Sequence, residues 1–421
     1  MTIRPLHDLI HAARTLAKAR SFTAVCVTSL GLGMGVAIVI MTFVGSLLST
    51  PYGVDDDGLI EVVIRPEGAL LAESGNAIID TFSYPDYLDV RDASEGMVTT
   101  GWSRAEALFR PAGETVPLGM AAMHVSSNYF STIGLVLPLG PGFTIVDDAS
   151  VARPEAVIGH RMWQLRFGSD PAIVGRAITI DRTDYVVVGV APERFRGHVN
   201  GLDDAYYQLW MPLSRHPRLS ETGNVRASRD VSWVRIVGRL AEGTTRAQAD
   251  ARVQSVMAGL AARYPSSNHA RVGGVEPYFS NGARKRTQMA GARLTMFMLA
   301  GIVMAVVALN LSGMLLVRSA MRERELAVRL ALGASRWRLM QYHLSEALVL
   351  ALAGGTLASA VVFGGPAIAA WWFNFSGPEL DVFRPSLGLA FQCLALCFVT
   401  SLVLGLLPAI RFSRPMILSA L

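Results

Sequence analysis

Few side chains in this sequence combine the types and the spacing of a catalytic or metal-binding site. His7 and His11 stand four residues apart in HDLIH, which would bring two imidazoles to one helix face. Asp8 stands where a zinc protease requires Glu, and catalysis would need a third ligand, so we interpret the pair as a solvated polar face. Asp86 and Asp89 in SYPDYLDVRD are candidates for an acid and base pair, but exposed carboxylates in such a stretch usually cap a helix or are solvated. The sequence therefore predicts no catalytic residue, no metal site and no cofactor.

Nucleotide-binding patterns are also missing from the sequence. Neither Lys18 nor Lys285 stands in a G-x-x-x-x-G-K-[ST] phosphate loop. The glycines of GLGMG lie inside an apolar run, where Gly31 and Gly35 have the small-xxx-small spacing of close helix packing. Any ATP-driven work would therefore require another subunit to hydrolyse the ATP.

Four long apolar runs indicate a membrane protein. The chain is 51% hydrophobic and only 17% charged, and a bilayer-spanning helix needs about 20 consecutive apolar residues. We predict four transmembrane helices, over residues 22–49, 294–317, 347–373 and 385–410. The three cysteines, Cys26, Cys393 and Cys397, all fall in these runs, and we interpret them as packing residues.

The distribution of charge predicts the orientation of these helices. Basic residues gather in three segments, 1–21, 318–346 and 411–421, and the positive-inside rule places such segments in the cytoplasm. The first segment includes an amphipathic helix over 4–18 that would lie on the inner membrane surface. Residues 50–293 and the short loop 374–384 would then lie outside, with both termini in the cytoplasm. The net charge of +5 could suggest binding to nucleic acid. Because the basic residues follow the orientation pattern of a membrane protein, we do not expect nucleic acid as a partner.

The long external segment, residues 50–293, has mixed patterns that predict an α+β domain of one or two lobes. Ala177–Val190 is expected to form two strands around a polar turn at Asp181–Asp184, and Val234–Leu240 another strand. Thr244–Tyr264 is expected to form a helix with one apolar face, comprising Ala247, Val253, Met257 and Leu260. The predicted fold class is an α-helical membrane protein with a large α+β extracytoplasmic domain between helices 1 and 2.

The basic loop 318–346 is the candidate functional site, and we call it the coupling loop. Arg322, Glu325 and Arg329 fall on one helix face, and a sharp turn is expected at Gly333–Ser335, just before Arg336. The loop could lie on anionic lipid, or it could dock a soluble partner, and the two readings are compatible. In the following span, Gly354 and Gly355 are expected to serve helix packing. No span carries a charge well inside it, which argues against an ion-coupled carrier.

Several long motifs resemble one family. RERELAVRLALGASRWRLMQYHLSEALVLALAGG resembles the signature loop and third span of the FtsX-like permeases, the group that includes the MacB-like transporters. FSYPDYLDVRD, HVSSNYFSTIGL and WVRIVGRLAEGTTRAQAD resemble the MacB-like periplasmic core domain. The two ends of the chain are most similar to one half of the duplicated orphan permeases.

The resemblance implies a four-span unit that dimerises and engages an ATP-binding ABC subunit through the coupling loop. It also implies that motion, rather than substrate, passes through the membrane to the periplasmic domain. The sequence departs from the family in having one unit and no fused nucleotide-binding domain, so it could pair with itself, pair with a second permease half, or be a shortened relic.

Three functional hypotheses follow. The first is a non-catalytic permease subunit of an FtsX/MacB-like ABC assembly in the bacterial inner membrane. The second is a membrane sensor or regulator whose external domain binds a ligand without any ATPase. The third, an enzyme acting on envelope polymers, lacks the nucleophile, base and stabiliser that it would need.

Overall fold

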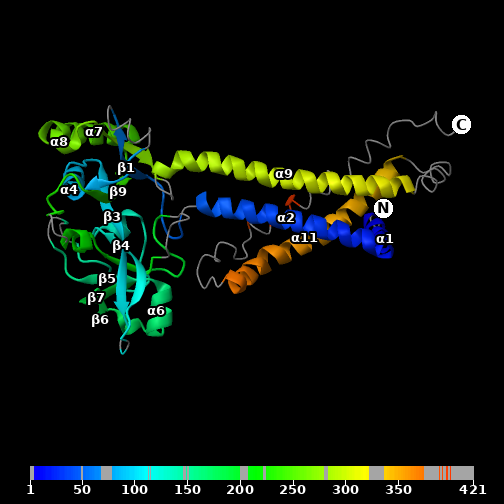
Figure 1. Cartoon of the computed structure of the whole chain (residues 1–421), viewed down its shortest axis with the longest axis horizontal. Helices are drawn as coiled ribbons and strands as arrows, with labels where there is room; N and C mark the ends of the chain where they lie inside the picture. The colour runs from blue at the N-terminus through cyan, green and yellow to red at the C-terminus, as the bar shows by residue number, and fades with distance from the viewer. Residues whose placement is uncertain are drawn as a thin grey trace. The chain divides into compact units, whose positions relative to one another are not determined.

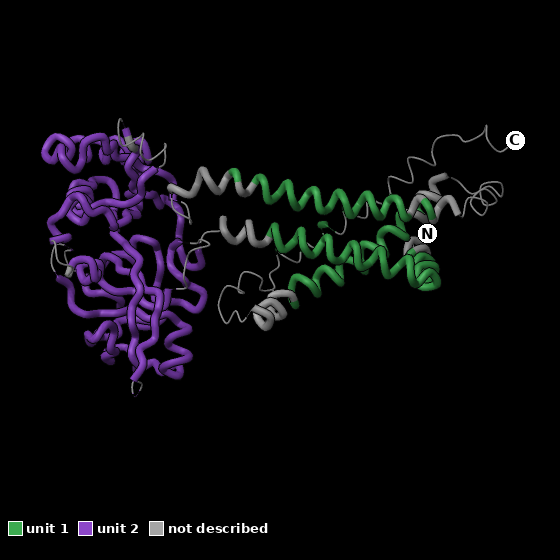
Figure 2. The backbone as a smooth tube through the Cα atoms, in the orientation of Figure 1, with its two compact units in different colours: residues 1–46, 291–421 green, residues 47–290 purple. Residues whose placement is uncertain are grey.

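The computed structural model describes most of the chain in two compact units, Met1–Ser46 with Gly291–Leu421, and Leu47–Ala290 (Figure 2). The described residues are 4–48, 51–67, 78–111, 113, 115–145, 148, 151–199, 207–220, 224–278, 283–321, 336–373, 388, 391, 395, 396 and 399. We describe each unit by itself.

Four helices make up most of the described part of the membrane unit. They are α1 (Arg4–Lys18), α2 (Arg20–Leu48), α9 (Ala283–Met321) and α11 (Arg336–Phe373) (Figure 1). Three stretches are long and apolar enough to cross a bilayer, namely Arg20–Met41, Leu294–Met314 and Leu344–Gly364. The predicted fourth span, 385–410, lies almost wholly outside the described residues.

A shared apolar core joins these helices. Leu16 of α1 packs in one cluster with Leu30 and Met34 of α2, Leu311 of α9 and Leu350 of α11. Cys26 is fully buried in the same cluster, as expected of a packing residue. The apolar side chains that α9 leaves exposed suit contact with lipid, and they include Leu294, Ile302, Val306, Leu309 and Val317.

The extracytoplasmic unit is built on a 10-stranded sheet. Its main path runs β10 (Arg271–Pro277), β1 (Leu59–Pro66), β9 (Ser232–Leu240), β3 (Met97–Arg110), β4 (Leu118–Val125), β8 (Leu209–Pro212), β5 (Glu155–Ile158), β7 (Thr183–Val190) and β6 (Ala177–Ile180), and β2 (Phe82–Ser83) pairs with β9. Most neighbours are antiparallel, while β4 with β8 and β5 with β7 are parallel.

Strand β3 belongs to two lobes at once. Its residues from Met97 to Trp102 pair with β9, whereas those from Trp102 to Phe109 pair with β4. Its last two residues, Phe109 and Arg110, also pair with β6. The path β3–β4–β8–β5–β7–β6 therefore returns to β3 and closes on itself. The division into lobes, which the sequence left open, falls along this strand.

Each lobe has its own helices and apolar core. In the open lobe, α4 (Tyr84–Asp92) and α7 (Arg246–Arg263) pack on the sheet, and α7 contacts β10 (Figure 1). In the closed lobe, α6 (His160–Phe167) contributes Met162 to a core formed by β3 to β8. The α+β class predicted for this domain is confirmed.

The predicted elements of this domain compare closely with the observed ones. The helix expected over Thr244–Tyr264 is α7, which Thr245 and Gln248 begin with a reciprocal capping box. The assignment of Ala247 to its apolar face is wrong, because Ala247 is exposed and Ala249 is buried instead. Two residues along a helix turn by about 200°, so these two alanines face in nearly opposite directions.

The hairpin expected over Ala177–Val190 is also present, as β6 and β7. Its turn is shorter than predicted, because Asp184 already belongs to β7. Asp181 and Arg182 make the turn, with φ of 49° and 65°.

Candidate functional site

The central part of the coupling loop, residues 322–335, lies outside the described residues. Arg322, Glu325, Arg329, Gly333 and Ser335 fall in the segment 322–335, and Arg336 is the first residue of α11. Their assignment to partner docking therefore stays a prediction.

The glycines predicted to serve helix packing lie where α2 meets α11. A Cβ added to Gly31 would stand 2.7 Å from Leu357 Cβ, and one added to Gly35 would stand 3.1 Å from Val361 Cγ1. From the other side, a Cβ on Gly354 would stand 2.7 Å from Leu30 Cβ. The two backbones approach so closely that a side chain at Gly31 or Gly354 would require the helices to move apart. Gly355 lies in α11, where its carbonyl accepts a hydrogen bond from the Ser359 hydroxyl at 2.8 Å.

Two more residues of the membrane unit have defined surroundings. Gly33, the middle glycine of GLGMG, faces α9, since a Cβ there would stand 2.5 Å from Val307 Cγ2. Glu346, expected in the loop, lies in α11 near the start of a candidate span and is only 3% exposed. Helix α11 begins at Arg336, directly after the turn expected at Gly333–Ser335, so Glu346 lies well inside this helix.

A buried ion pair organises the open lobe. The Arg229 guanidinium donates to Asp86 Oδ1 and, at 2.7 Å, to Asp89 Oδ2, and it lies 3.9 Å from the centroid of the Tyr264 ring. Asn268 Nδ2 donates to Asp86 Oδ1 at 3.0 Å. Asp86 is fully buried, so the expectation of an exposed carboxylate is wrong for this residue.

The arrangement around Asp86 favours a structural role over proton transfer. Its carboxylate is held by an arginine and an amide from distant parts of the chain, and the helix cap that the sequence suggested is supplied by Ser83 instead. A fixed ion pair lacks the free access to a substrate that a general acid or base requires.

A second buried cluster in the same unit surrounds the carboxylate of Asp148. The Tyr87 hydroxyl bonds Asp148 Oδ2 and lies 2.7 Å from Ser126 Oγ. Burial and the Asp148 carboxylate raise the pKa of Tyr87 well above its usual value, so this phenol stays protonated and acts as a donor. Arg91 Nη1 approaches the same carboxylate at 3.7 Å.

Three histidines of this domain are buried among aromatic residues. The rings of His124 and His216 have centroids 4.7 Å apart, and His216 lies 4.4 Å from Trp233. His198 Nδ1 lies 2.7 Å from the Tyr129 hydroxyl. Burial lowers the pKa of all three, to about 4 for His216 and to about 3 for His198. These imidazoles are neutral core groups, and the described residues contain no group of three or more potential metal ligands.

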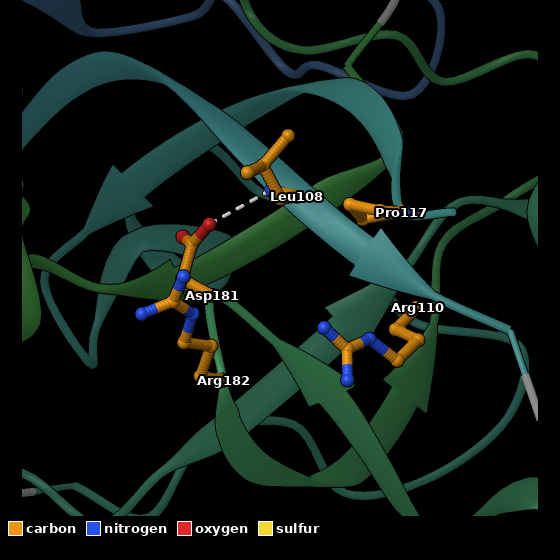
Figure 3. A pocket seen from close by; sticks show the side chains of 5 residues that line it. All are labelled: Leu108, Arg110, Pro117, Asp181 and Arg182. Atoms are coloured by element: carbon orange, nitrogen blue, oxygen red, sulfur yellow. Dashed lines mark hydrogen bonds between the residues drawn. The ribbon is translucent and has the colours of Figure 1, made fainter. Parts of the chain in front are cut away.

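One surface hollow lies at the end of the closed lobe. It has a volume of ≈ 350 Å³ and is lined by Leu108, Arg110, Pro117, Asp181 and Arg182 (Figure 3). Leu108 N donates to Asp181 Oδ1 at 2.8 Å, and Asp181 N donates to Leu108 O at 3.0 Å. The β6–β7 turn is thereby fixed to β3. No sequence pattern predicts this hollow, because its lining comes from two hairpins about 70 residues apart that meet only in the folded domain.

Comparison with known families now identifies the chain. Residues 23–256 match the MacB-like periplasmic core domain, and residues 297–416 match the FtsX-like permease C-terminal domain. The chain belongs to the MacB/FtsX-like permease family. The match to the first domain covers the extracytoplasmic sheet apart from β10, and the second covers the region of the coupling loop.

Individual relatives agree with this assignment. The macrolide export ATP-binding/permease protein MacB of Burkholderia cenocepacia is 28% identical over 301 residues, which are 69% of this chain and 39% of that protein. The pyoverdine export ATP-binding/permease protein PvdT of Pseudomonas syringae pv. syringae is 26% identical over 278 residues, 65% of this chain and 38% of that protein. The chain thus spans less than half the length of these curated relatives.

Among solved structures, the periplasmic region of MacB from Actinobacillus actinomycetemcomitans aligns at 14% identity and a TM-score of 0.37, covering 56% of this chain and 94% of that one.

Proposed function

We propose that this chain is a non-catalytic permease subunit that transmits ATP-driven motion from a cytoplasmic ATP-binding subunit to its own extracytoplasmic domain. We place it in the bacterial inner membrane, with both termini cytoplasmic, paired with a second copy or a second permease half. The work performed outside would be export or another envelope process.

The observation that carries this proposal is the continuity of α9. This helix runs without a break for 39 residues, from Ala283, shortly after the last strand of the extracytoplasmic sheet, to Met321 at the start of the coupling loop. At about 1.5 Å per residue it is about 58 Å long. Its sequence contains no proline, the commonest cause of a sharp kink. An unbroken helix of this length is suited to carry a displacement along its axis.

The polarity of the candidate spans supports mechanical coupling over ion-coupled transport. Among the described residues of these spans, the buried polar side chains are Ser312, Ser345 and Glu346, and the last two lie together near one end of α11. Ion-coupled carriers place charged or polar side chains near the middle of the membrane. Near the middle of the described spans there is no charged side chain, and the polar groups there are hydroxyls such as those of Thr28 and Thr356.

The names of the relatives support an ATP-binding partner. Both relatives named above are ATP-binding/permease proteins, and this sequence contains no phosphate loop. We assign the docking of that partner to the coupling loop, through Arg322, Glu325 and Arg329.

Charge reversal in the coupling loop tests this function. Arg322→Glu and Arg329→Glu should each weaken co-purification of an ATP-binding subunit from native membranes. Arg324→Glu is the matched control, because it makes the same change of charge between the positions assigned to the docking face. The purified chain alone should show no ATP hydrolysis. Undiminished association in both test variants would refute the docking assignment, and ATP hydrolysis by the chain alone would refute the non-catalytic role.

A further inference from the structure

The hollow at the end of the closed lobe has the composition of a ligand site. Its apolar lining residues are Leu108, which is 51% exposed, and Pro117, which is half-buried, and Arg110 and Arg182 also line it (Figure 3). Small-molecule pockets typically enclose about 300–1,000 Å³ and combine an apolar lining with a few polar groups. The volume of ≈ 350 Å³ is at the lower end of that range, which suits a small ligand.

The two arginines are available to such a ligand. Within the part of the chain that the structure describes, neither guanidinium group makes a hydrogen bond or an ion pair. They come from different elements, Arg110 from the end of β3 and Arg182 from the β6–β7 turn, and Figure 3 shows them on two sides of the hollow. The lining also contains Asp181, whose carboxylate accepts the Leu108 N–H, so among the described lining residues two positive charges stand against one negative charge.

The backbone holds Arg182 at this hollow at an energetic cost. Arg182 has φ of 65° and Asp181 has φ of 49°, the left-handed region that Gly and Asn adopt more readily. Two-residue turns of this kind usually contain Asn-Gly or Asp-Gly, so Arg stands where Gly would be more stable. A residue kept in a disfavoured conformation is a reason to look for a function of its side chain.

We propose that this hollow, the Arg110–Arg182 pocket, binds a small amphiphilic anion, a carboxylate or phosphate carried on an apolar body. The guanidinium groups donate charge-assisted hydrogen bonds to the oxyanion. The apolar body covers Leu108 and Pro117 and removes them from water. This binding is independent of the coupling loop and of any ATPase.

The test is a ligand-observed NMR titration of the full chain in a non-ionic detergent, with empty micelles as the baseline. The probes are phenyl phosphate, benzoate, inorganic phosphate and neutral benzyl alcohol. We expect phenyl phosphate or benzoate to bind more tightly than both inorganic phosphate and benzyl alcohol, because only these two probes combine charge with an apolar ring. Comparison of phenyl phosphate with benzoate distinguishes the two anion chemistries.

Three substitutions make the assignment specific. Arg110→Gln and Arg182→Asn should each weaken binding of the anionic probe about tenfold, as expected for the loss of one charged hydrogen bond. Arg182→Asn removes the charge while placing in the turn a residue that suits its backbone, so a folding defect would not account for lost binding. Arg263→Gln is the control, since Arg263 is an exposed arginine of α7 in the other lobe.

The proposal is overturned by any of three results. The first is equal binding of the anionic probe by wild type and the two test variants. The second is binding of benzyl alcohol as tight as that of the anions, which would indicate apolar adsorption alone. The third is an affinity of the wild-type chain weaker than about 10 mM for both phenyl phosphate and benzoate, since such binding is worth less than about 3 kcal/mol.

Discussion

The stability of the extracytoplasmic domain should fall steeply as the pH is lowered from about 7 to about 5, because three of its histidines are buried in the neutral state. Burial lowers the pKa of His216 to about 4 and of His198 to about 3, and it lowers that of His124 well below the usual value. In the unfolded chain each imidazole regains a pKa near 6.5. At pH values between the folded-state pKa and about 6.5, the unfolded state binds protons that the folded state does not.

The sign and size follow from linkage. A folded-state pKa below the unfolded value means that the stabilisation is fully present above about pH 6.5 and is lost as the pH falls toward the folded-state pKa. Each histidine contributes a slope of up to about 1.4 kcal/mol per pH unit. At about pH 5 the loss is about 2 kcal/mol each for His198 and His216, about 4 kcal/mol together, and His124 adds to it in the same direction. That is comparable with the lower end of the stability of an ordinary domain, about 5–15 kcal/mol.

Substitution of His124 should remove the contribution of one histidine to the pH dependence of stability. Among the described residues neither ring nitrogen of His124 has a hydrogen-bond partner, so His124→Phe removes no bond and no donor or acceptor in use. We expect the variant to be at least as stable as wild type near pH 8 and to be destabilised less than wild type when the pH is lowered. The control is His269→Gln, because the His269 side chain is exposed and the change should leave the slope as it was.

The measurement is urea unfolding of the full chain in a non-ionic detergent between about pH 8 and about pH 5, followed by tryptophan fluorescence. Trp102 and Trp233 are suitable reporters, since they contact His198 and His216 at ring-centroid distances of 4.6 Å and 4.4 Å. A wild-type slope below that of one proton, about 1.4 kcal/mol per pH unit, would refute the reasoning. An unchanged slope in His124→Phe would refute the role of that residue.

Two further substitutions test the buried contacts of the two units. Arg229→Met should lower the free energy of unfolding of the extracytoplasmic domain by about 3–5 kcal/mol, since it leaves the buried Asp86 carboxylate without its cation. Arg252→Met, at an exposed pair with Glu95, should change it by less than about 1 kcal/mol, and equal effects in urea unfolding would contradict the argument. Gly31→Ala should lower the thermal midpoint of the membrane unit in detergent, because the new methyl group meets α11, whereas Gly301→Ala, with open space around it, should not.

Local signals made some of this structure predictable. Helix α7 could be located because Thr245 and Gln248 form a capping box and because buried residues recur along one face. The β6–β7 hairpin could be located from its alternating strands around a polar turn. In the membrane unit, the length of the apolar runs was sufficient to locate three helices.

Contacts between distant segments could not be predicted in this way. The burial of Asp86 depends on Arg229 and Asn268, which are 143 and 182 residues away along the chain. The same sequence pattern would suit an exposed turn if those partners were absent. The Arg110–Arg182 pocket likewise exists only because β3 pairs with β6, and no periodicity within either strand specifies that partner.

Strand β3 belongs to both lobes, and this affects how the extracytoplasmic domain would respond to an applied displacement. Trp102 is the residue at which β3 passes between lobes, since it is paired both with Arg235 of β9 and with Val125 of β4. Beside it, Gly101 has no room for a side chain, because an added Cβ would stand 2.7 Å from Leu213 and 2.8 Å from Tyr87. Bending the strand there would break ladder hydrogen bonds and open a close-packed contact at the same time. A displacement applied to one lobe would therefore move the other with it, as the proposed mechanical function requires of a domain driven through helix α9.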